Sequence, residues 1–152
     1  MKALYFIFPM TALLSACSST TDSSEDISKL NYLDLSTPEL RDTEKEYWLN
    51  KKRVEPIYPA KAAKKGITGC VELVTVINSQ GKAQGYKVIS SYPEGVFDQS
   101  SLKAVKLWRW EAAPQNTNKQ PVLTNIRLDY SLTPKPTGEE YLKNCPARKF
   151  YY

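Results

Sequence analysis

The sequence contains no histidine. That absence excludes Ser-His-Asp and Cys-His catalysis, and it excludes every metal site with a histidine ligand. Cys17, Cys70 and Cys145 are its only cysteines, too few for a four-cysteine zinc site within one chain. We therefore expect no metal, no cofactor and no enzymatic activity.

The chain is 152 residues long, which corresponds to about one domain. Hydrophobic residues make up 41% and charged residues 24%, a mixture typical of a globular chain. The formal net charge of +5 is unevenly spread, because residues 18–46 hold eight acids and three bases whereas residues 51–65 hold six bases and one acid. The basic run indicates either contact with anionic lipid or an acidic partner, or simply a solvated face.

The N-terminus has the pattern of an export signal. Lys2 precedes an apolar run from Ala3 to Ala16, which is shorter than the roughly 20 residues that a membrane-spanning helix needs. The run ends in Leu14-Ser15-Ala16-Cys17, which resembles a bacterial lipobox. The lipobox implies that the Cys17 thiol is acylated and becomes the first residue of the mature chain. An ordinary cleaved signal or a buried helix is the alternative interpretation.

Export determines where the protein is expected to act. Ser18 follows the cysteine, and by resemblance to enteric lipoproteins a residue other than Asp there favours the outer membrane over the inner. We expect a periplasmic, lipid-anchored (palmitate-carrying) protein with no nucleic-acid partner. Export also places Cys70 and Cys145 in an oxidising compartment.

The expected domain organisation is a signal peptide, a tether, a helical segment, a folded domain and a tail. Their residues are 1–16, 17–36, 37–53, 54–133 and 134–152. Small polar and acidic residues at 18–26 predict that 17–36 is flexible. Within the helical segment, residues 38–50 carry Pro38 at the first helical position and an apolar stripe of Leu40, Tyr47 and Trp48.

The body of the chain shows a strand-strand-helix-strand pattern. Residues 70–78 and 84–91 predict an antiparallel hairpin, and residues 97–109 predict a helix that buries one face. The residues of that face are Phe97, Ser101, Ala104, Val105 and Trp108. Residues 120–132 alternate, with apolar side chains and Thr124 at the even positions from Val122 to Leu132, which predicts a strand buried on one face.

Several short motifs occur in a fixed order along this body. They are Pro56-Ile57-Tyr58-Pro59, Gly66 with Gly69, Gly81 in the hairpin turn, Ser90-Ser91, Phe97-Asp98, and Trp108-Arg109-Trp110 before the alternating strand. Together they resemble the C-terminal domain of the TonB family of energy-transducing proteins over roughly residues 54–132.

The resemblance implies an α+β fold, with a three-stranded antiparallel sheet that carries a helix on one face. In that family the domain grips a short extended peptide of an outer-membrane transporter, which adds a strand beside the last strand of the sheet. Carried over here, the partner-binding residues are Pro56, Tyr58 and Pro59, together with Asn125, Arg127 and Asp129 in the last strand. For Tyr58-Pro59 a rigid loop packed on the edge of the sheet is an equally good interpretation.

The sequence departs from an energy-transducing TonB in its N-terminal part. A lipobox and a short Ser/Thr/Asp segment stand where such a protein has a spanning helix and a long proline-rich spacer. The leading hypothesis is therefore a lipid-anchored domain that captures an extended segment of an envelope protein, such as a TonB-dependent outer-membrane receptor. The alternative is a structural or scaffold lipoprotein whose sheet edge is covered by the chain itself or by a homodimer. The third hypothesis, and the least favoured, is an enzyme that uses Ser/Lys chemistry at Ser100, Ser101 and Lys103.

Cys70 and Cys145 predict a disulfide, because they are an even pair in an oxidising compartment. The bond would fasten the apolar tail across the face of strand 70–78 that points away from the helix. The alternative is two thiols unpaired within the chain, with Cys145 bonded to another chain.

Overall fold

The computed structural model describes residues 26–133 and 138–147. The expected signal peptide, the lipobox with Cys17 and residues 17–25 of the expected tether lie outside the described residues. So do residues 134–137 and 148–152 of the expected tail.

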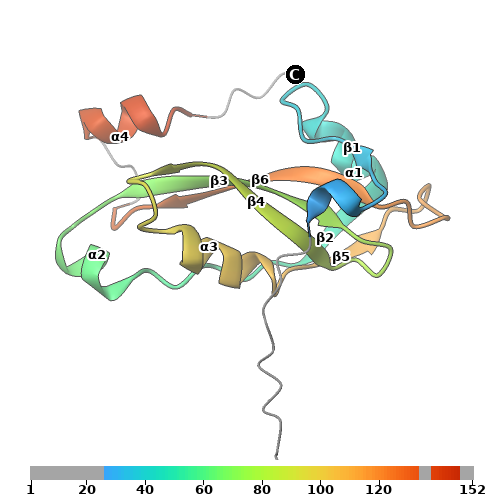
Figure 1. The fold of residues 1–152 in the computed structure, drawn as a ribbon, viewed down its shortest axis with the longest axis horizontal. Coiled ribbons are helices and arrows are strands. Elements are labelled where there is room, and N and C mark those ends of the chain that lie inside the picture. Colours follow the sequence, from blue (N-terminus) through green and yellow to red (C-terminus); the bar gives the residue numbers. More distant parts are fainter. Residues whose placement is uncertain (1–25, 134–137, 148–152) are drawn as a thin grey trace, which may run out of the picture.

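The centre of the molecule is a four-stranded sheet in the order β1-β6-β3-β4 (Figure 1). Its strands are β1 (Leu33–Asp34), β3 (Gly69–Ile77), β4 (Ala83–Tyr92) and β6 (Val122–Tyr130). The pairs β3–β4 and β3–β6 are antiparallel, whereas β1 runs parallel to β6. The prediction of a three-stranded sheet is therefore wrong by one strand, and that strand comes from the N-terminal part of the chain.

The prediction of a flexible tether over 17–36 is wrong for residues 26–36, because this segment lies on the sheet. The Leu33 N–H donates to the Pro121 carbonyl (2.9 Å) and the Leu35 N–H donates to the Leu123 carbonyl (3.0 Å). Leu35 is buried. The prediction rested on the polar residues and overlooked three apolar side chains that follow them. Ile27, Leu30 and Tyr32 pack against the sheet, where they contact the cluster of Val74, Val76 and Leu123.

A second, two-stranded sheet replaces much of the helix expected at 38–50. That segment holds only a 3-10 turn (Arg41–Thr43) and α1 (Glu44–Tyr47), after which β2 (Trp48–Lys52) pairs with β5 (Arg109–Ala112). Trp48 is buried, and its indole N–H donates to the Gln120 carbonyl (2.8 Å). These long-range contacts outweigh the local helical pattern, so the helix ends at Tyr47.

The predicted hairpin is confirmed, and it contains two irregularities. Strand β4 carries one extra residue at each of two points in its pairing with β3. Gly85 is skipped between the pairs at Tyr86 and Gln84, and Ile89 is skipped between the pairs at Ser90 and Val88. Gly85 has a φ of 64°, which suits the bulge position that favours glycine.

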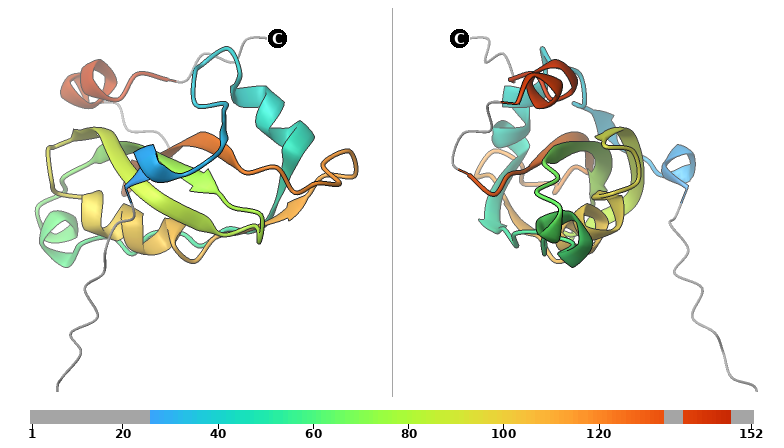
Figure 2. Two further views of the ribbon diagram at one scale, coloured as in Figure 1. Left: turned by 45° about the vertical axis from the view of Figure 1, so that its right-hand side comes forward. Right: turned by 90° about the vertical axis from the view of Figure 1, so that its left-hand side faces the viewer.

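One face of the sheet is covered by α2 (Ala60–Lys64) and α3 (Asp98–Val105), and α4 (Glu139–Asn144) lies on the other (Figure 2). Helix α3 is shorter than the expected 97–109, but the predicted face is confirmed. All five of its residues are buried: Phe97, Ser101, Ala104, Val105 and Trp108. The even residues of β6 from Val122 to Tyr130 are likewise buried on this side.

The predicted disulfide is confirmed. Cys70 and Cys145 are bonded with their Cα atoms 5.9 Å apart, within the normal range for a disulfide. Tyr141 of α4 packs with both cysteines and with Tyr92 of β4. The C-terminal helix thus covers one end of the sheet face opposite α3.

Candidate functional site: the outer edge of strand β6

Strand β6 has one fully paired side and one partly paired side. Its pairing with β3 runs without a register shift from Gly69↔Tyr130 to Ile77↔Val122. On the other side β1 pairs only at Leu33↔Val122 and Asp34↔Leu123. Beyond Leu123, no strand in the described part of the chain lies along this outer edge.

The hydrogen bonds to β1 show which main-chain groups face outward. The carbonyls of Pro121 and Leu123 point to the outer edge, because they accept from Leu33 and Leu35. In a regular strand the N–H and C=O of alternate residues point to the same side. The outward groups beyond β1 therefore belong to Asn125, Arg127 and Asp129.

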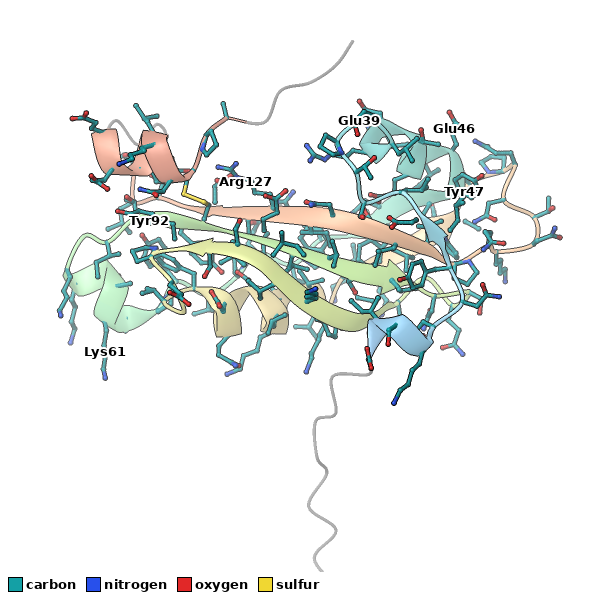
Figure 3. All side chains as sticks on the ribbon, turned by 45° about the horizontal axis from the view of Figure 1, so that its top comes forward. Glu39, Glu46, Tyr47, Lys61, Tyr92 and Arg127 are labelled. Atoms are coloured by element: carbon teal, nitrogen blue, oxygen red, sulfur yellow. A yellow bond between two sulfur atoms is a disulfide. The ribbon has the colours of Figure 1, made fainter. Side chains whose placement is uncertain are left out.

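The side chains of Arg127 and Asp129 project from the sheet face that carries α4, and both have partners there. The Arg127 Nε lies 2.9 Å from Asp129 Oδ1, and Arg127 Nη1 donates to the Pro146 carbonyl (2.5 Å). The Tyr141 hydroxyl donates to Asp129 Oδ1 (3.1 Å). The Arg127 side chain is only 10% exposed, and Figure 3 shows it beside the disulfide. The tail therefore uses both side chains within the molecule.

Tyr58 lies on the opposite side of the sheet. Its hydroxyl donates to the Ile67 carbonyl (2.5 Å), and its ring packs edge-on against Phe97 and Tyr130 at centroid distances of 5.5 and 5.7 Å. Burial raises the pKa of the Tyr58 hydroxyl. These contacts make Tyr58 part of the packing between α3 and the sheet.

Pro56 and Pro59 belong to the same structural unit as Tyr58. Pro59 is the residue that precedes α2, and the Ser100 hydroxyl of α3 donates to the carbonyl of Ile57 between them. The structure thus brings Asn125, Arg127 and Asp129 together along β6, and it places the Pro56–Pro59 segment on the other face.

Two elements border the outer edge. One is β1, which was not predicted, and the other is α1, the part of the predicted 38–50 helix that the structure retains; its Glu44 carboxylate accepts from the Thr124 hydroxyl. The one local signal for β1 is Asp34 two residues before Ser36, since the Asp34 carboxylate accepts from the Ser36 N–H (2.9 Å) and so marks a turn after the strand.

No cluster of three or more His, Cys, Asp or Glu residues that could hold a metal ion occurs within the described ranges. In the same ranges no helix is both long enough and apolar enough to cross a bilayer.

Comparison with known proteins places this edge in a family context. The profile of the family described as "Gram-negative bacterial TonB protein C-terminal" matches residues 54–132, which is more than half of the chain. The chain belongs to the TonB C-terminal domain family. The matched range contains β3, β4, α3, β5 and β6, so the candidate edge is part of the TonB-like domain.

Individual relatives agree with this assignment over part of their length. The chain is 36% identical over 56 residues to Protein TonB of Pseudomonas aeruginosa, covering 37% of this chain and 16% of the relative. It is 33% identical over 76 residues to Protein TonB of Vibrio cholerae, covering 50% of this chain and 30% of the relative. The chain thus spans less than a third of either relative.

A solved structure supports the fold. The solution structure of the Pseudomonas aeruginosa TonB C-terminal domain superposes with a TM-score of 0.50 at 22% identity, covering 59% of this chain and 90% of that domain. At that identity the likeness concerns the fold alone.

Proposed function

We propose that this TonB-like domain captures an extended segment of another envelope protein by strand addition along the outer edge of β6. The observation that carries the proposal is that β6 is an edge strand of the sheet beyond Leu123, with the main-chain groups of Arg127 and Asp129 directed outward. Such pairing supplies affinity through main-chain hydrogen bonds. The proposed partner is a TonB-dependent outer-membrane receptor.

The intramolecular contacts of β6 shape this proposal. The Arg127 side chain is bonded to Asp129 and to the Pro146 carbonyl and is only 10% exposed, so it contributes little direct contact to a partner. The Asp129 carboxylate accepts from Tyr141 and keeps half of its side chain exposed. Capture therefore depends on the main chain of β6 and tolerates variation in the partner's sequence. Strand β1 already occupies the start of the edge, so the added segment is short and begins after Leu123.

The test compares two substitutions at Arg127. Arg127→Ala and Arg127→Pro both remove the guanidinium, but only proline also removes the outward N–H while leaving the ladder to β3 intact. A photo-crosslinker in place of Leu132, which is 53% exposed just after the strand, reports capture in intact cells. We expect the Ala variant to keep its adduct and the Pro variant to lose it, with both retaining the Cys70–Cys145 bond. Equal adducts from the two variants would rule out strand addition here.

The lipid anchor is a second part of the proposal. A lipid on Cys17 would hold the domain at the periplasmic face of a membrane, the outer membrane in preference, without a spanning helix. Cys17→Ser removes the acyl acceptor, so the variant should lose metabolic palmitate label and leave the membrane fraction. A serine variant that stays labelled and membrane-bound would refute the lipobox interpretation.

The structural alternative receives support from β1, which covers the first part of the β6 edge within the chain. In that alternative a second copy pairs with the remaining edge, and the protein scaffolds the envelope without a transport role. The crosslinking experiment separates the two, because a homodimer gives an adduct of twice the chain mass. Neither version requires a cofactor or enzymatic activity.

A further inference from the structure

A polar hollow of about 510 Å³ lies at the end of the molecule far from α4, between β1, α1 and the loop 114–121. Its volume is within the range of small-molecule sites. Figure 3 shows Tyr47 and Glu46 at this end of the molecule and Tyr92 and Lys61 at the opposite end. The hollow is assembled from segments that are distant in sequence, and it is separate from the outward groups of Arg127 and Asp129.

The floor of the hollow is rigidly built. Asn116 is buried, its amide donates to the Tyr47 carbonyl (2.9 Å), and its side-chain oxygen accepts from the Gln120 N–H (2.8 Å). The Gln120 carbonyl in turn accepts from the Trp48 indole (2.8 Å). A surface fixed by internal, partly buried hydrogen bonds before a ligand arrives loses less conformational freedom on binding.

The rim of the hollow, by contrast, carries polar side chains without partners. Within the described ranges, no hydrogen bond is formed by the side chains of Gln115, Thr117 and Asn118, nor by the hydroxyls of Tyr32 and Tyr47, and all of these residues line the hollow. Amide and hydroxyl groups both donate and accept. The two tyrosine rings add flat apolar surface that ends in a polar group.

The charges around the hollow narrow the class of ligand. Among the described residues that line the hollow, Glu46 is the only one with a carboxylate, and none is a lysine or an arginine. Without a lysine or an arginine these residues form no ion pair with a phosphate or a carboxylate, the Glu46 carboxylate repels an anion, and the amide-rich rim gives little to an apolar molecule. A neutral molecule with many hydroxyl groups and flat C–H faces matches both the amides and the tyrosine rings.

We propose that this hollow binds a neutral oligosaccharide. The amides of Gln115 and Asn118 hydrogen-bond its hydroxyls, and the rings of Tyr32 and Tyr47 pack against its sugar faces. Leu33 of β1 also lines the hollow, so a bound sugar would contact the strand that covers the start of the β6 edge. The inference goes beyond strand capture and does not depend on it.

The test titrates the full chain with two neutral probes, triacetylchitotriose and maltotriose, and follows backbone and side-chain amide signals by NMR. We expect at least one probe to shift the signals of residues 32–33, 46–47 and 115–120. The double variant Gln115→Ala/Asn118→Ala should weaken that binding about tenfold or more, since each lost hydrogen bond is worth up to about tenfold in affinity.

Gln99→Ala is the matched control, because Gln99 is an exposed amide on α3 away from the hollow. It should leave the affinity unchanged. No shift with either probe at millimolar concentration would overturn the proposal, and so would shifts that survive the double variant or that lie outside the hollow. Crosslinking from Leu132 is unaffected by any of these outcomes, so the two proposals fail separately.

Discussion

Trp108 joins three parts of the domain through a single side chain. Its indole N–H donates to the Val54 carbonyl (2.8 Å), the Arg53 guanidinium carbon lies 5.0 Å from its ring centroid, and its ring lies 5.8 Å from that of Trp110. The residue is only 5% exposed. It therefore holds the segment before α2 against both α3 and β5.

Trp108→Ala should lower the free energy of unfolding by about 3–5 kcal/mol, because it removes a large buried side chain and leaves a cavity. A domain of this size holds only about 5–15 kcal/mol in total, so the variant is expected to be marginal. Chemical denaturation measures the loss. Leu107→Ala is the neighbouring control, since Leu107 is 53% exposed and surface changes usually cost less than about 0.5 kcal/mol. Similar losses in the two variants would contradict the packing described for Trp108.

Among the tyrosines in the described ranges, three have hydroxyls whose pKa is raised in the fold: Tyr58, Tyr130 and Tyr141. Burial raises the pKa of Tyr58 and Tyr130, and burial together with the Asp129 charge raises the pKa of Tyr141. A raised pKa means that the native state retains protons that the unfolded chain has lost. Stability from these groups is thus fully present below about pH 10 and declines as the pH rises further.

An alkaline titration followed by near-ultraviolet absorbance should show a late-ionising group of tyrosines. Tyr141→Phe should shrink that group while leaving the fold intact, because Tyr141 lies on α4 and not between α3 and the sheet. If all tyrosines ionised together at their ordinary pKa in the native protein, the burial of these hydroxyls would be contradicted.

At the level of secondary structure, the elements with strong local patterns were predictable and those defined by distant contacts were not. The alternation in β6 and the buried face of α3 are properties of contiguous residues, so the sequence predicts both. Strand β1 has only two residues, too few for a period to show. The start of β2 at Trp48 depends on pairing with Ala112 and on a bond to Gln120, neither of which is local.

The attachment of helix α4 to the sheet can be tested directly, because one disulfide joins the end of the helix to β3. Cys145→Ser removes the bond to Cys70, which closes a loop with a sequence separation of 75. Chain-entropy arithmetic for such a loop gives a loss of up to about 4.5 kcal/mol. Hydrogen exchange should show residues 138–147 opening, because six helical residues alone are too short to be stable in water.

Cys17→Ser serves as the matched control for loss of a cysteine outside the bond, and it should leave hydrogen exchange of α4 unchanged. Unaltered protection of residues 138–147 in Cys145→Ser would show that Tyr141 and Pro146 hold the helix without the disulfide.

For the molecule as a whole, the sequence indicated which strand carries the candidate site, but not which of its side chains are already bonded within the molecule. The family resemblance directs attention to Asn125, Arg127 and Asp129, and the structure does align them on one strand edge. Their surroundings could not be foreseen, because the tail contacts to Pro146 and Tyr141 join residues far apart in sequence. Tyr58 is drawn into the core for the same kind of reason, through rings contributed by α3 and β6.

The two bulges of β4 limit how many further strands can add to the sheet. A sheet with two regular open edges can add copies at both ends and grow into a fibre. Here the β4 edge is interrupted at Gly85 and Ile89, and bulged edge strands make poor templates for pairing. Under the proposed strand addition, growth would therefore proceed in one direction only, from β6. A partner on β6 would end the series, and the assembly would close at one partner per domain, or at a two-fold dimer, without polymerising.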